Sequence, residues 1–228
     1  MHEIPFDIVG FDLDGTLVDT HRDLGEAVNH ALGLAHRPAV PIAQVRSLVG
    51  GGSRLMLLRA LEATGGPLPD EEVAELHRHL LDHYEANIAV HSRLFPGGDA
   101  MLAGLTERGI KLAVVTNKLE RYTRLLLDAL DLTRNFACIL GGDSLGPGRG
   151  KPEPDLLVEM IVRCGGGSGA YVGDTTFDTR AAIAAGIPCV AVSFGFNDLP
   201  PQDLGAAAVI GHFDRLIPVL EGLGVTQP

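Results

Sequence analysis

The strongest constraint on the fold is a recurring pattern of short apolar segments that end in polar residues or glycine. Five such segments predict buried strands, at residues 8–11, 112–116, 170–172 and 189–192, with a shorter one at 138–140. Segments with helical spacing lie among them, at residues 98–108, 120–130, 155–163 and 179–185. Strands that alternate with helices form βαβ units. The pattern therefore predicts an α/β fold, a doubly wound parallel sheet covered by helices on both faces.

One region breaks this alternation. Between about residues 23 and 89 no segment predicts a strand, and three segments, at 23–34, 54–63 and 70–87, predict helices. A stretch of about 65 residues is too long to be a simple loop. We therefore expect a small α-helical cap domain, residues 21–91, inserted into an α/β core formed by residues 1–20 and 92–228. The turn Pro96-Gly97-Gly98 would mark the return to the core.

The composition sets limits on partners and location. The 228 residues are 46% hydrophobic and 21% charged, which is typical of a globular protein. A net charge of −11 argues against nucleic acid or an anionic membrane as partner. Three cysteines without paired spacing, the absence of a signal-peptide pattern, and the absence of an apolar run of about 18 residues favour a cytoplasmic protein. We expect it to be a monomer or a homodimer.

The residues that could do chemistry follow the predicted strands. In open α/β sheets, ligands bind at the carboxyl ends of the strands. The first strand is followed by Asp12 and, two residues later, Asp14. The strand at 112–116 ends in Thr116, and Asn117 and Lys118 come next. We therefore expect these polar side chains to meet at one edge of the sheet.

Two further loops belong to the same edge. One contains Lys151 in the sequence GKPEPD, and the other is GDTTFD, which contains Asp174 and Asp178. Together these groups suit phosphoryl transfer, because a carboxylate can attack phosphorus and a second one can act as general acid and base. Several carboxylates in one place need a cation, and oxygen ligands favour Mg²⁺. Lys151 adds a positive charge, and Thr116 can donate a hydrogen bond to a phosphate oxygen.

Four motifs in this order resemble those of the haloacid dehalogenase superfamily. They are DLDGT at 12–16, VVTN at 114–117, KPEP at 151–154 and GDTTFD at 173–178, and the resemblance covers nearly the whole chain, including the helical cap. The resemblance implies that Asp12 is the nucleophile and Asp14 the general acid and base. It implies Mg²⁺ bound by the Asp12 side chain, the Asp14 backbone carbonyl and Asp174, with Asp178 in support. Phosphate would be bound by Thr116 and Lys151, with Asn117 beside them.

The aspartate at position 14 separates branches of this superfamily. Its dehalogenases use no metal and lack an acid at this position, so Asp14 makes the chain similar to phosphatases and phosphomutases. The cap segment LVGGGSRLMLLRAL, residues 48–61, resembles that of phosphoglycolate phosphatases, as do DTHRDLGEAVNHAL and FPGG. This implies a small carboxylated phosphomonoester, 2-phosphoglycolate, as substrate. Its carboxylate would lie near Gly51, Gly52 and Arg54, at a helix N-terminus, which favours an anion.

Other functions fit the same motifs. A β-phosphoglucomutase-like sugar phosphomutase, a pyrophosphatase and a nucleotidase would all share the core residues. A non-catalytic binding module on the same fold is a fourth alternative, although the intact set of motif residues argues against it. We also expect the cap to open and close about hinges near residues 16–20 and 89–96. Asp19, where the chain leaves for the cap, is interpreted as a hinge or turn residue.

Overall fold

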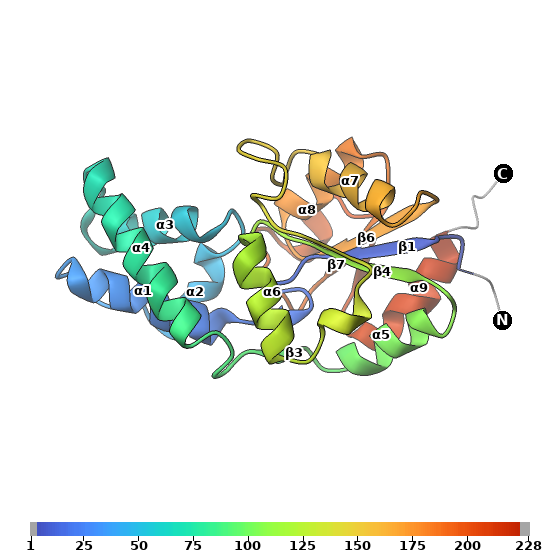
Figure 1. Cartoon of the computed structure of the whole chain (residues 1–228), viewed down its shortest axis with the longest axis horizontal. Helices are drawn as coiled ribbons and strands as arrows, with labels where there is room; N and C mark the ends of the chain where they lie inside the picture. The colour runs from blue at the N-terminus through green and yellow to red at the C-terminus, as the bar shows by residue number, and fades with distance from the viewer. Residues whose placement is uncertain (1–3, 224–228) are drawn as a thin grey trace.

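The core of the protein is a six-stranded parallel sheet, seen in a computed structural model that describes residues 4–223 (Figure 1). The ends of the predicted core, residues 1–3 and 224–228, lie outside the described residues. Across the sheet the strands are β5 (Cys138–Leu140), β4 (Lys111–Val115), β1 (Ile8–Phe11), β6 (Gly169–Gly173), β7 (Cys189–Val192) and β8 (Ala208–Ile210). The predicted doubly wound α/β fold is confirmed.

Helices cover both faces of this sheet (Figure 1). They are α5 (Gly98–Thr106), α6 (Glu120–Ala129), α7 (Asp155–Arg163), α8 (Thr176–Ala184) and α9 (Leu216–Leu223). Along β1 the side chains alternate between two hydrophobic clusters: Ile8 joins the cluster of α7 and α8, and Val9 joins that of α5, α6 and α9. Burial on both faces explains why the strands read as continuous apolar segments rather than alternating ones.

Strand β1 lies at the point where the strand order reverses. It pairs with β4 on one side and with β6 on the other, so Phe11 lies opposite both Val114 and Val172. The residues that follow these three strands therefore emerge together at one edge of the sheet. This is the position at which doubly wound sheets form ligand sites.

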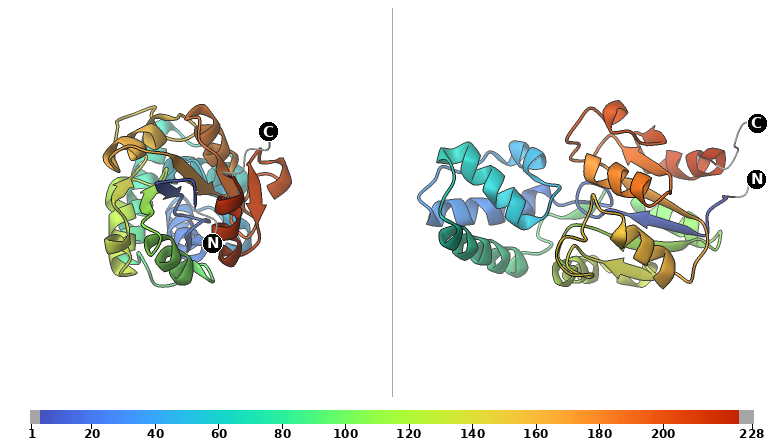
Figure 2. Two further views of the ribbon diagram at one scale, coloured as in Figure 1. Left: turned by 90° about the vertical axis from the view of Figure 1, so that its right-hand side faces the viewer. Right: turned by 90° about the horizontal axis from the view of Figure 1, so that it is seen from above.

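The helical insert lies beyond that edge (Figure 2). Its helices are α1 (His21–Leu34), α2 (Ile42–Val45), α3 (Ser53–Gly65) and α4 (Asp70–Ala86). They enclose a hydrophobic cluster of their own, which one core residue, Tyr122 of α6, also joins. The helical insert that the sequence predicts is present.

A short antiparallel ribbon joins the insert to the core. Strand β2 (Val18–Asp19) pairs with β3 (Arg93–Leu94). Next to the ribbon, the buried Asp23 carboxylate of α1 accepts hydrogen bonds from the backbone N–H groups of His91 and Ser92. The ribbon escaped prediction because two-residue strands show no periodicity. The ribbon lies close to both predicted boundaries between the cap and the core. The assignment of residues 21–91 to a separate cap domain stays a prediction.

Three elements of the core differ from the sequence prediction. Helix α8 begins at Thr176, three residues earlier than expected, because Thr175 and Asp178 form a capping box. Strand β8 and helix α9 were not predicted. Strand β8 is three residues long and only its last residue is buried, so it carries no clear strand signal.

Two further features bear on the sequence analysis. The three cysteines are buried and unbridged. Among residues 4–223, none of the helices combines the length and the apolar character that crossing a membrane requires.

Tight packing around β1 generates a first prediction. A Cβ on Gly10 would lie 2.3 Å from Sδ of the buried Met160 and 3.0 Å from the Tyr171 ring. We expect Gly10→Ala to lower the free energy of unfolding by about 1–3 kcal/mol, measured by urea denaturation.

The matched control is Gly33→Ala on α1, where a Cβ would meet nothing within 4 Å. Alanine inside a helix is more favourable than glycine by about 0.5–1 kcal/mol, so this variant should be slightly more stable. Equal stability of the two variants would show that the packing around β1 is looser than described.

Candidate active site

The loop after β1 holds two aspartates at the edge of the sheet. The backbone N–H of Asp12 donates to the Val172 carbonyl at 2.9 Å, which fixes the start of the loop. The loop then folds back so that the Gly15 N–H donates to the Val18 carbonyl at 3.0 Å. Gly15 has a φ of +84°, and a Cβ there would lie 2.4 Å from Asp174 Oδ2. Only glycine therefore permits this turn beside the acidic site.

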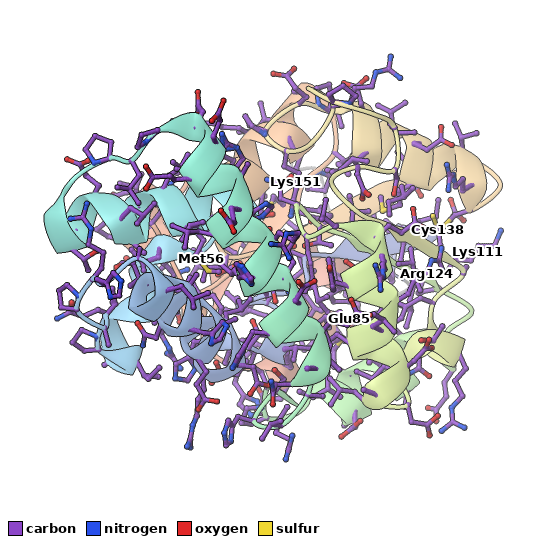
Figure 3. The ribbon with its side chains drawn as sticks, turned by 60° about the vertical axis from the view of Figure 1, so that its left-hand side comes forward. Met56, Glu85, Lys111, Arg124, Cys138 and Lys151 are labelled. Atoms are coloured by element: carbon purple, nitrogen blue, oxygen red, sulfur yellow. The ribbon has the colours of Figure 1, made fainter. Side chains whose placement is uncertain are left out.

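Lys151 lies buried in the middle of the acidic groups. Its Nζ lies 2.9 Å from Asp12 Oδ1 and donates hydrogen bonds to Asp178 Oδ1 at 2.6 Å and to the Tyr171 hydroxyl at 2.9 Å. Burial disfavours the charge, but the two carboxylates outweigh it and raise the pKa of Lys151 above its usual value. Figure 3 shows Lys151 on the part of the core that faces the helical insert. The lysine is therefore a fixed cation at the predicted phosphate site.

Three buried carboxylates lie close together here, and two of them contact this lysine. Asp12, Asp174 and Asp178 each place one oxygen within 4.8 Å of the others. Burial, followed by the charge of Asp178, raises the pKa of Asp174 well above its usual value. Burial also raises the pKa of Asp12 to about 6, although Lys151 opposes the rise. One lysine cannot neutralise three buried acids, so the donor set fits a divalent cation that prefers oxygen ligands.

The hydrogen bonds of these acids distinguish ligands from supports. Asp178 Oδ1 accepts from Lys151, and its Oδ2 accepts from the Thr175 hydroxyl and from the backbone N–H groups of residues 174 and 175. Each oxygen of Asp174 accepts one hydrogen bond, from Thr16 and from the Phe196 N–H, and so keeps a lone pair. Asp12 and Asp174 are thus better placed to bind a cation, and Asp178 is better placed to support them.

The loop after β4 contributes Thr116 and Asn117 to the site. The Thr116 hydroxyl can still donate to a ligand, whereas the Asn117 amide already donates to two backbone carbonyls. Thr116 is buried, and among residues 4–223 its Oγ1 accepts only from the Lys118 N–H, so the hydroxyl hydrogen is available to a ligand. The Asn117 amide donates to the Gly50 carbonyl at 3.3 Å and to the Lys151 carbonyl at 2.9 Å. Asn117 therefore connects the insert to two core loops. Its expected place beside the phosphate stays a prediction.

Lys118 is a site residue whose partner the sequence does not indicate. Its Nζ lies 3.0 Å from both oxygens of Asp14, and the Thr20 hydroxyl also donates to Asp14 at 2.7 Å. Burial disfavours the lysine charge, but Asp14 outweighs it and raises the pKa of Lys118. Lys118 comes two residues after Thr116, and this position in the sequence predicts that it lies at the same edge of the sheet. It does not predict that Asp14 is its partner.

A cavity lies between this edge and the insert, with a volume of about 40 Å³. We call it the interdomain cavity. Its core lining is Asp12, Asp14, Thr116, Asn117, Lys118, Leu119 and Tyr122, and its insert lining is Leu24, Val49, Gly50, Gly52, Ser53, Met56, Leu80, Leu81 and Tyr84. Figure 3 shows Met56 in the insert, on helix α3.

The predicted cap residues are divided between this cavity and a neighbouring cleft. Gly52 lines both, whereas Gly51 and Arg54 line only the cleft, which has a volume of about 460 Å³. The Arg54 guanidinium is paired with the exposed Asp70 at 3.1 Å. Of the three residues, only Gly52 lies beside the carboxylates of the first loop.

Comparison with known proteins agrees with this arrangement. The model of the family described as haloacid dehalogenase-like hydrolase matches residues 9–192. A protein named phosphoglycolate phosphatase from Mesorhizobium japonicum is 43% identical over 211 residues, which cover 92% of each chain. Another of that name, from Caulobacter vibrioides, is 39% identical over 215 residues, 93% of this chain and 90% of the relative.

Solved structures show the same fold. A crystal structure described as a predicted phosphoglycolate phosphatase from Haemophilus somnus superimposes with a TM-score of 0.86 at 29% identity. The superposition covers 94% of this chain and 97% of the other. The similarity thus extends through both the sheet and the helical insert.

The pair between Lys118 and Asp14 leads to a second prediction. Lys118→Met shortens the unbranched side chain by one atom and removes the charge that Asp14 faces at 3.0 Å. Loss of one partner from a buried ion pair leaves the other uncompensated. We expect hydrolytic turnover to fall at least tenfold on every substrate that the protein accepts, measured as initial rates. Lys111→Met, on the far end of β4, is the control, and an equal loss there would contradict the prediction.

Proposed function

We propose that this chain, which belongs to the haloacid dehalogenase-like hydrolase family, is a Mg²⁺-dependent phosphatase that hydrolyses a small phosphomonoester, 2-phosphoglycolate. The observation that carries the proposal is the position of Asp12. It lies beside the buried cation of Lys151, 2.9 Å away, and lines the cavity between the core and the insert. The Asp12 carboxylate is thus largely buried and has the proposed phosphate-binding lysine next to it.

In the proposed reaction Asp12 attacks the phosphorus atom, and the bond from phosphorus to the ester oxygen breaks. Asp14 gives its proton to the departing oxygen, so that a neutral alcohol leaves. Water then attacks the aspartyl-phosphate, Asp14 takes the proton, and inorganic phosphate is released. Asp14 lies two residues from Asp12 and lines the same cavity, which supports this division of work.

Other groups would stabilise the transferred phosphate. Lys151 supplies a fixed positive charge, and Thr116 supplies a hydroxyl hydrogen that no acceptor in the described part of the chain takes up. The Asp12 side chain, the Asp14 backbone carbonyl and Asp174 would hold Mg²⁺, whose charge offsets the repulsion between carboxylates and phosphate. Tyr171 and Asp178 hold Lys151 in place by accepting hydrogen bonds from its ammonium group. Gly51, Gly52 and Arg54 remain proposed substrate contacts of the cap.

The substrate proposal rests on relatives and on size. Relatives at 36–43% identity are named phosphoglycolate phosphatase. The small interdomain cavity favours a substrate of few atoms over a sugar phosphate or a nucleotide. The buried, unbridged cysteines and the net charge of −11 support a cytoplasmic protein without nucleic acid or membrane partners.

A panel of phosphate esters tests the substrate. We expect phosphate release from 2-phosphoglycolate to have the highest kcat/KM, above glucose phosphates, pyrophosphate and nucleoside monophosphates, in a molybdate assay. A sugar phosphomutase would instead isomerise β-glucose 1-phosphate, in the presence of a bisphosphate primer, without net release of phosphate. If sugar phosphates or pyrophosphate rank first, the substrate proposal is wrong.

The nucleophile is tested by Asp12→Asn. The amide is nearly the same size but cannot attack phosphorus, so turnover should fall by at least a thousandfold. The substitution also removes a charge from a cluster in which burial disfavours it, so the melting temperature should stay equal or rise. Undiminished phosphate release by a folded Asp12→Asn variant would refute the mechanism.

Metal dependence is tested by removal and return of the ion. Treatment with EDTA followed by desalting should abolish phosphate release, and millimolar Mg²⁺ should restore it. Asp174→Asn should raise the Mg²⁺ concentration needed for half-maximal activity by about tenfold or more, because one charged ligand is lost. Full activity after EDTA treatment would contradict the metal requirement.

A further inference from the structure

We propose that Tyr84 of helix α4 and Lys118 of the loop after β4 bind the acidic end of the substrate, opposite the phosphate. This assignment rests on the proposed function, since it concerns the same cavity. The four motifs are expected to bind the phosphate end of the substrate, and they include neither Tyr84 nor Lys118.

Tyr84 presents an unused hydrogen-bond donor. The residue is 2% exposed, and its hydroxyl has no hydrogen-bond partner among residues 4–223. Its ring packs edge-on against Tyr122, and the residue lines the interdomain cavity. A buried hydroxyl without a partner is unfavourable, and such groups in native proteins call for an explanation. A ligand in the cavity would supply the missing acceptor.

The ionisation of Tyr84 agrees with this role. Burial raises the pKa of Tyr84 to about 12, although the nearby Lys118 charge opposes the rise. The hydroxyl therefore keeps its proton at neutral pH and acts as a donor. A donor is what a carboxylate requires.

Lys118 adds the positive charge. Its Nζ lies over the Tyr84 ring, 4.5 Å from the centroid, so the two groups occupy the same corner of the cavity. An ammonium group has three N–H donors, and two of them face the Asp14 oxygens. The Lys118 charge, together with the hydrogen of the Tyr84 hydroxyl, makes a pair suited to an anionic oxygen.

The other polar side chains around the cavity are less available. Ser53 Oγ is hydrogen-bonded to His77 Nε2 at 2.8 Å, and the Asn117 amide donates to two backbone carbonyls. Arg54 does not line the cavity and is paired with Asp70. The insert otherwise contributes apolar side chains, such as Met56 and Leu80. Tyr84 and Lys118 are thus the best-placed groups for an acidic substituent.

The relative positions of these groups select a class of substrate. Asp12 and Thr116 line the same cavity as Tyr84 and Lys118, so one small molecule can contact both pairs. A phosphomonoester with a carboxylate one or two carbons from the ester oxygen fits this requirement. An ester of the same length without the carboxylate would leave the Tyr84 hydroxyl buried and unpaired.

The experiment compares two esters with the same two-carbon chain, 2-phosphoglycolate and ethyl phosphate, on the wild-type protein and on Tyr84→Phe. We expect the wild type to prefer 2-phosphoglycolate in kcat/KM. Tyr84→Phe should lower that preference about tenfold to a hundredfold, chiefly by raising KM for 2-phosphoglycolate, because a hydrogen bond to a charged group is lost. Its melting temperature should not fall, because the hydroxyl hydrogen has no acceptor among the residues that the structure describes.

One control and one test of a rival position accompany Tyr84→Phe. The control is Tyr122→Phe, which removes a hydroxyl from the neighbouring ring of the same cavity wall. We expect this variant to keep the preference within about twofold of the wild type. Arg54→Gln removes the guanidinium of the neighbouring cleft and tests whether the carboxylate lies there.

The outcomes separate this inference from the proposed function. If the wild type releases phosphate from neither ester nor from any other phosphomonoester, the proposed function fails. If it is an active phosphatase but Tyr84→Phe leaves the preference unchanged, the assignment of Tyr84 and Lys118 is wrong. A preference that collapses in Arg54→Gln and survives in Tyr84→Phe would place the acidic end of the substrate in the cleft instead.

Discussion

The arrangement of the site depends on one buried cation, the ammonium group of Lys151. It lies between Asp12 and Asp178 and also contacts the Tyr171 hydroxyl. Without it, three carboxylates would be buried within 4.8 Å of one another with no compensating charge from the chain. The position of the Lys151 ammonium depends in turn on the sheet. The Tyr171 hydroxyl that it contacts belongs to β6 and donates to the Val115 carbonyl of β4. The fold thus holds a set of charges in place that would otherwise repel one another.

The helical insert depends on a second set of contacts across the same edge. Asn117 connects the Gly50 carbonyl to the Lys151 loop, and Lys118 lies between Asp14 and the Tyr84 ring. The contacts with Gly50 and Tyr84 join the insert to residues that follow β4, and the contacts with Lys151 and Asp14 join those same residues to the core. The position of the insert and the environment of Asp14 therefore both depend on one loop. Movement of the insert on the ribbon of β2 and β3 would change both together.

Much of the site could be predicted because parallel strands bring their carboxyl ends to one edge. Asp12, Thr116 and Asp174 follow β1, β4 and β6, and these three strands are neighbours in the sheet. Each of these strands can be recognised in the sequence as an apolar segment followed by polar residues. Where the local signal is short or absent, as in the two-residue ribbon and the edge strand β8, prediction from sequence failed.

The sequence by itself determined the α/β class, the helical insert and the set of residues that reach the edge of the sheet, because these follow from local periodicity and from residue chemistry. The tertiary structure alone decided which partner each residue meets. It directs the Asn117 amide to backbone carbonyls, pairs Lys118 with Asp14, and brings Tyr84 from α4 against Lys118 without giving its hydroxyl a partner. Such contacts join residues far apart in the chain, and no local pattern encodes the distance between them.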